Sequence, residues 1–94
     1  MIKHIVCFKL NNQDDIKKSQ EILLSMKGKV PQIIDIQANV DVLHSARSYD
    51  IILEVTLKDL STLAAYQQDP YHCDVVKEFI HKVTAQSIAI DYQI

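Results

Sequence analysis

The feature that most constrains the fold is the order of two hydrophobic periodicities along the chain. Alternating apolar and polar residues, often β-branched, predict strands at residues 2–10, 33–43, 49–57 and 86–93. Between the first two strands, and again between the last two, apolar residues recur at helical spacing. The order strand, helix, strand, strand, helix, strand predicts an α+β, ferredoxin-like βαββαβ fold, with a four-stranded antiparallel sheet and its helices on one face.

Capping residues predict where the helices begin. Asn12 is a candidate cap for the first helix, and Gly28 is a natural residue at which that helix stops. Asp59 precedes a short second helical stretch. Asp69 followed by Pro70 is a second start signal, because Asp accepts backbone N–H groups at an N-cap and Pro fits the first helical position. The second helical unit is therefore predicted to be split at this point.

The chain has 94 residues, which fits one domain spanning 1–94. Its net charge of −2, with dispersed lysines, argues against binding to nucleic acid or to an anionic membrane surface. No apolar run reaches the ~18 residues of a membrane span, and the alternating N-terminus does not resemble a signal peptide. A single glycine excludes phosphate-binding loops of the P-loop and dinucleotide types.

Cysteine and histidine spacing gives no sign of a metal site. Cys7 and Cys73 are far apart and are interpreted as free thiols of a cytoplasmic protein. The four histidines form no i,i+4 pair, so we expect neither a bound metal nor a cofactor.

The helices can cover only one face of the predicted sheet. We expect them to pack on the more apolar face, which carries Val6, Phe8, Leu53 and Val55. The opposite face is predicted to combine apolar and charged side chains: Ile5, Cys7, Ile52, Glu54, Ala89 and Asp91. A face of this composition suits a self-complementary interface, so we predict a homodimer formed through the sheets.

Three side chains form a candidate catalytic site on the helix side: His4, Tyr66 and His72. His72 stands near a helix N-terminus, where the dipole favours a neutral ring that can act as a base. Tyr66 can hydrogen-bond a substrate carbonyl and stabilise an enolate. The alternatives remain open: a core histidine at 4, a rim tyrosine with a wet hydroxyl at 66, and a histidine at 72 that bonds the backbone of Asp69.

The chain resembles the stress-response A/B barrel (Dabb) domain family. The resemblance rests on "HIVCFKL", "VPQI", "YDIILEV", "LAAYQQDPYHCDVVKEF" and the closing "IDY". It implies a dimeric α+β barrel in which the sheet of one subunit packs on that of a second. The family usually reads "HPxH" where this chain reads "DPYH", with Asp69 in place of the first histidine, and Gly where it has Ser48.

The resemblance also implies a chemistry. One plant member closes a polyketide ring by an aldol-type reaction, with a histidine, a tyrosine and a second histidine at positions matching His4, Tyr66 and His72. This favours a His/Tyr-lined pocket for an apolar, carbonyl-bearing molecule, with cofactor-free chemistry of the cyclase or lyase kind. A cofactor-free monooxygenase, as in related barrels, is a variant. A non-enzymatic stress or assembly protein is the alternative, and whether the protein is an enzyme stays open.

Overall fold

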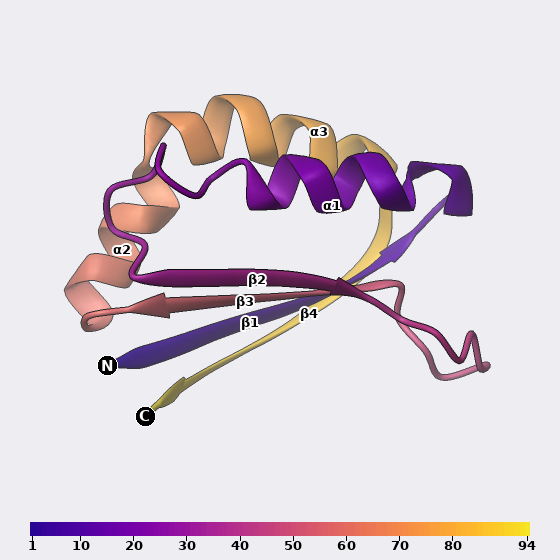
Figure 1. Cartoon of the computed structure of the whole chain (residues 1–94), viewed down its shortest axis with the longest axis horizontal. Coiled ribbons are helices and arrows are strands. Elements are labelled where there is room, and N and C mark those ends of the chain that lie inside the picture. The colour runs from indigo at the N-terminus through magenta and orange to yellow at the C-terminus, as the bar shows by residue number, and fades with distance from the viewer.

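The sheet has the predicted strands in an antiparallel arrangement. The computed structural model describes all residues 1–94, and the strand order is β2-β3-β1-β4. The strands are β1 (Ile2–Leu10), β2 (Asp35–Val40), β3 (Ile51–Leu57) and β4 (Thr84–Gln93). All three strand pairs are antiparallel, and the chain termini lie side by side at one end of the sheet (Figure 1). The predicted ferredoxin-like α+β fold is confirmed.

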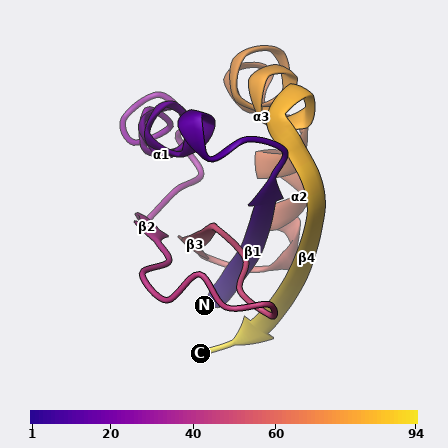
Figure 2. The same cartoon turned by 90° about the vertical axis from the view of Figure 1, so that its right-hand side faces the viewer.

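The helices lie on a single face of that sheet. They are the short 3₁₀ turn η1 (Gln13–Asp15), α1 (Ile16–Leu24), α2 (Leu60–Gln68), the π-helical turn η2 (His72–Lys77) and α3 (Glu78–Val83). Both cartoon views place α1 and α3 on the same side of the sheet (Figures 1 and 2). The core between the two layers is apolar, and its least exposed members include Leu23, Met26, Val55, Leu57 and Val76. None of the helices has the length and apolar character required to span a bilayer.

The predicted caps are confirmed in their hydrogen bonds. The Asn12 side chain accepts from the backbone N–H of Asp14 at 2.9 Å. The Asp59 side chain accepts from the backbone N–H of Thr62 at 2.8 Å. Asp69 has an extended backbone, and its Oδ1 accepts from the N–H groups of Tyr71 at 2.9 Å and His72 at 3.3 Å. The last cap fixes where the third long helical segment begins.

Several predicted boundaries were wrong by a few residues. β2 and β3 are shorter than the predicted 33–43 and 49–57, whereas β4 begins two residues before the predicted 86–93. Residues 33 and 34 precede β2, whereas residues 41–43 and 49–50 belong to the loop of residues 41–50, whose polar groups bond locally. In that loop Asp41 accepts from the backbone of His44 at 2.6 Å, and His44 has a positive φ of 55°. Local side-chain bonding of this kind competes with strand pairing.

The second helical unit contains one turn that sequence periodicity did not predict. From His72 to Lys77 the backbone is π-helical before it returns to α-helix at Glu78. A π turn holds an extra residue within an α-helical segment, often at a functional site.

Ala89 and Asp91 lie on the helix side of the sheet, so their predicted placement on the opposite face was wrong. β4 pairs with β1 so that Ala89 is opposite Val6 and Asp91 is opposite His4. Directly paired residues share a face. The helix-free face of β4 instead carries Ile88, Ile90 and Tyr92. Figure 2 shows β4 at one edge of the sheet, and its residues after Thr84 are exposed on both faces. The sequence of β4 therefore has no buried stripe to indicate which of its residues face the helices.

Candidate functional site

All three predicted site residues line one cavity between the sheet and the helical segment that follows Asp69. The cavity has a volume of about 460 Å³, within the roughly 300–1,000 Å³ range of small-molecule sites. Its wall combines apolar and polar side chains; the principal ones are His4, Val6, Phe8, Leu53, Tyr66 and His72. The predicted convergence of His4, Tyr66 and His72 is therefore present.

His4 is buried and hydrogen-bonded to an acidic residue on the neighbouring strand. Only 8% of His4 is exposed, and its Nδ1 contacts Oδ1 of Asp91. The antiparallel register places these two residues directly opposite each other. A carboxylate at one imidazole nitrogen orients the ring and selects its tautomer. Nε2 makes no hydrogen bond within the chain.

Asp91 is the site residue that sequence reasoning missed. Its side chain is 35% exposed, and it reaches His4 only because β4 pairs with β1 in this register. The available signal was a lone carboxylate in the apolar segment "SIAIDY". Without the register, that signal does not say which face the carboxylate occupies.

Tyr66 is the centre of the site. Its ring is fully buried, and lies 5.6 Å from the His4 ring in an edge-on arrangement and 4.5 Å from the His72 ring in a stacked one. The hydroxyl donates to the Met26 sulfur at 3.8 Å, so the alternative of a wet rim tyrosine is wrong. Burial raises the pKa of Tyr66. The ring separates the two imidazoles and holds them in place.

His72 presents an unpartnered polar atom beside the cavity. Its Nδ1 is buried and has no hydrogen-bond partner. Burial is the largest cause that lowers the pKa of His72, followed by the charges of Lys77 and His4. The Asp69 carboxylate and the Gln67 backbone act in the opposite direction, and the net lowering of the pKa favours the neutral imidazole. The alternative in which its side chain bonds the Asp69 backbone is not observed; instead the His72 backbone N–H donates to the Asp69 carboxylate.

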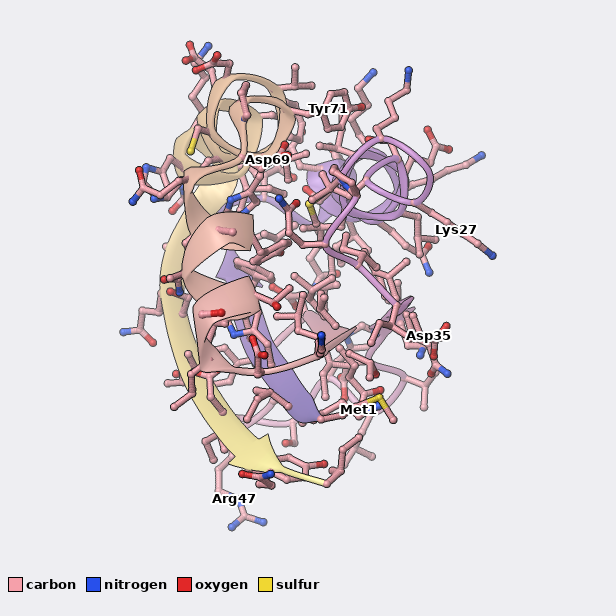
Figure 3. All side chains as sticks on the ribbon, turned by 90° about the vertical axis from the view of Figure 1, so that its left-hand side faces the viewer. Met1, Lys27, Asp35, Arg47, Asp69 and Tyr71 are labelled. Atoms are coloured by element: carbon pink, nitrogen blue, oxygen red, sulfur yellow. The ribbon has the colours of Figure 1, made fainter.

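The remaining candidates lie apart from this arrangement. His44 is exposed in the loop of residues 41–50, and Arg47 of the same loop projects away from the body of the molecule, remote from Asp69 and Tyr71 (Figure 3). Burial, followed by the Glu54 carboxylate, raises the pKa of Cys7. The Cys73 thiol donates to the backbone oxygen of Gln67 at 3.2 Å. No group of three or more His, Cys, Asp or Glu side chains is arranged to hold a metal ion.

His81 was expected to be an exposed residue away from the apolar stripe. It is exposed, but it also lines the mouth of the cavity together with Lys77. These two residues are four apart on one helical segment, a spacing that brings side chains to the same face. Both residues are polar, which is why the apolar stripe of this segment did not include them.

Comparisons with known proteins agree with the observed fold. The model of the family described as Stress responsive A/B Barrel Domain matches residues 2–94. No curated protein sequence matches the chain.

Solved structures at low sequence identity share the fold. A dimeric ferredoxin-like protein of unknown function from Thermobifida fusca is 22% identical with a TM-score of 0.84, covering 99% of this chain and 90% of that one. A dimeric protein of unknown function with a ferredoxin-like fold from Bacteroides fragilis is 19% identical, also with a TM-score of 0.84, over 99% and 95%. A hydroxynitrile lyase from Passiflora edulis is 16% identical with a TM-score of 0.82, over 99% and 92%.

Proposed function

This chain belongs to the stress responsive A/B barrel (Dabb) domain family, and from that membership and the cavity geometry we propose that it binds a small apolar carbonyl compound and acts on it by cofactor-free acid–base chemistry of the cyclase or lyase kind. The observation that carries the proposal is the buried, unpartnered Nδ1 of His72 beside a cavity that His4 also lines. An unpaired buried polar atom is costly, and a ligand oxygen would satisfy it.

The two histidines have different roles in this proposal. The sequence pointed to His72 as the base, whereas the contact of Asp91 with His4 favours His4. With Nδ1–H donated to the Asp91 carboxylate, Nε2 of His4 carries the lone pair that accepts a proton, and the carboxylate stabilises the imidazolium that forms. The neutral ring of His72 donates a hydrogen bond from Nδ1 to the carbonyl oxygen.

The proposed reaction conserves every proton. Nε2 of His4 removes a proton from the carbon beside the carbonyl. The C–H electron pair forms a carbon–carbon double bond, and the π pair of the carbonyl moves to its oxygen to give an enolate. The enolate, held by His72, attacks a second carbonyl of the same molecule and forms a carbon–carbon bond. His4 then returns its proton to the new alkoxide. Val6, Phe8 and Leu53 supply an apolar wall, which strengthens these electrostatic interactions by excluding water.

The existence of a hydroxynitrile lyase with the same fold supports lyase chemistry as a variant. In that variant Nε2 of His4 takes the proton from a hydroxyl, and the electron pair of the O–H bond forms the carbonyl. The electron pair of the carbon–carbon bond departs with the leaving group, which then takes the proton from His4. The same two imidazoles serve both directions of carbonyl chemistry.

Binding of matched ligands tests this proposal. Acetophenone and ethylbenzene have similar shapes, but only acetophenone has a carbonyl oxygen. We expect wild-type protein to bind acetophenone about tenfold more tightly in a calorimetric or NMR titration, since a buried hydrogen bond is worth about 1–1.5 kcal/mol. His72→Leu is expected to abolish the preference, and His44→Ala, in the exposed loop, to retain it. Equal binding of both ligands by wild-type protein would count against the proposal.

The alternative function is that of a non-enzymatic assembly protein, and the helix-free sheet face is the surface through which it would assemble. This face, called the open face below, carries Ile5, Cys7, Ile52, Ile88, Ile90 and Tyr92. Ile88 is 52% exposed and Ile90 63% exposed, and apolar side chains gathered on one exposed face often mark an interaction surface. We propose that two copies pair through their open faces, as the dimeric relatives lead us to expect. Pairing there leaves the cavity, on the helix side, available to a ligand.

A further inference from the structure

The mouth of the cavity has a chemical character that the carbonyl chemistry does not use. Lys77 and His81 line it from the helical segment, while Thr84 and Ser87 line it from β4. Ser87 is paired with Phe8 and therefore lies on the helix side of the sheet. We call these four residues the mouth cluster. The mouth cluster thus adds one cationic, one imidazole and two hydroxyl side chains to a cavity that His4, Gln67, Gln68 and His72 also line.

The positive charge of Lys77 has no partner within the chain. The three ion pairs closer than 4 Å are His4–Asp91, His44–Asp41 and Lys82–Glu78, and none includes Lys77. Glu78 is directed to Lys82, at 3.5 Å. The charge of Lys77 is nevertheless close enough to the cavity to lower the pKa of His72.

Thr84 supplies a second, independent observation. Its Oγ1 is buried and has no hydrogen-bond partner, although the residue lines the cavity. Buried hydroxyls normally find a partner. Two unpartnered buried atoms therefore flank the cavity, His72 Nδ1 near the catalytic residues and Thr84 Oγ1 at the mouth. A ligand that satisfies both has polar groups at both ends.

We propose that the mouth cluster binds a carboxylate, so that the substrate is an apolar carbonyl compound bearing one carboxylate group. The carboxylate oxygens accept hydrogen bonds from Lys77 and from the Thr84 hydroxyl, with Ser87 and His81 at the rim. A single lysine matches the single negative charge of a carboxylate, and charge-assisted hydrogen bonds of this kind are the stronger ones. The carbonyl end then faces His4 and His72. The inference rests on the proposed function and adds the substrate class to it.

A pair of ligands that differ only in charge tests the inference. 4-Acetylbenzoate and its methyl ester carry the same acetyl carbonyl, and only the first has a carboxylate. In calorimetric titrations of the full chain, we expect the acid to bind about tenfold more tightly than the ester. Lys77→Met keeps the apolar stem and removes the charge, so it is expected to weaken acid binding to the level of the ester while leaving ester binding unchanged. Thr84→Val should weaken acid binding alone, by about threefold to tenfold.

Lys82→Met is the matched control, since it removes a lysine of the same helical segment that is paired with Glu78 and does not line the cavity. It should leave both affinities as in wild type. If the ester and the acid bind with equal affinity, the carboxylate inference is overturned and the proposed function still stands. An equal loss of acid binding in Lys77→Met and Lys82→Met would also overturn it, because the effect would then be one of overall charge. Absence of binding by both ligands would contradict the proposed function together with the inference.

Discussion

At the scale of single residues, the site depends on two imidazoles whose surroundings differ. His72 is held neutral by burial, whereas His4 is oriented by Asp91. Because burial lowers the pKa of His72 below 6.5, the unfolded chain binds a proton at this position more readily than the folded one. The contribution of His72 to the unfolding free energy is complete above about pH 6.5. It is lost as the pH falls through the pKa that His72 has in the folded protein. We expect the unfolding free energy of wild type to fall more between pH 7 and pH 5 than that of His72→Gln in urea titrations. A larger fall in the variant would contradict the assignment.

Asp91 gives a second prediction at this scale. In Asp91→Asn the carboxylate that orients His4 is replaced by a neutral amide of similar shape. Because the side chain of Asp91 is 35% exposed, we expect little change in melting temperature. ¹⁵N NMR of the imidazoles should show a changed tautomer balance at His4 and an unchanged one at His44. An unaltered His4 spectrum would show that Asp91 does not control the ring.

At the scale of elements, the start of the helix after α2 determines where His72 lies. The capping bonds of Asp69 fix that start. Asp69→Ala should therefore cost about 0.5–2 kcal/mol of unfolding free energy, measured by urea denaturation. Asp74→Ala, which removes an exposed carboxylate two residues beyond His72, is the control and should cost less. A cost equal to that of the control would mean that the cap contributes nothing.

The same scale shows what could be predicted from the sequence. The helix starts were predictable because Asn12, Asp59 and Asp69 cap them through local hydrogen bonds. The four strands were predictable because apolar and polar residues alternate along them. His4 was placed on the correct face because β1 has a clear apolar period. Asp91 and the π turn were not predictable, since the register of an edge strand and the winding of a helix are decided by partners distant in the sequence. The mouth residues Lys77 and His81 were missed because they are polar neighbours of the apolar stripe and not members of it.

At the scale of the whole molecule, the sheet separates two surfaces with different tasks. The helix side contains the cavity, and the open face is the proposed interface between copies. Ile52→Asp would bury an unpaired charge in that interface, so we expect monomers, or loss of folding, by light scattering coupled to size exclusion. Leu60→Asp replaces an apolar residue that is 67% exposed on α2 and should leave the assembly unchanged. A dimer of normal stability with Asp at position 52 would exclude this interface.

The central claim is that His4 and His72 transfer protons on a carbonyl compound, and hydrogen exchange measures that step directly. Acetophenone in D₂O loses its methyl proton signal in ¹H NMR as each proton beside the carbonyl is removed and replaced by deuterium. The proposed mechanism predicts that wild-type protein accelerates this loss over buffer, and that His4→Ala and His72→Ala each reduce the acceleration by about 10²-fold or more, the usual contribution of a positioned acid or base. His44→Ala is predicted to exchange at the wild-type rate. Exchange at the buffer rate in wild type, or acceleration that survives in His4→Ala, would contradict the account.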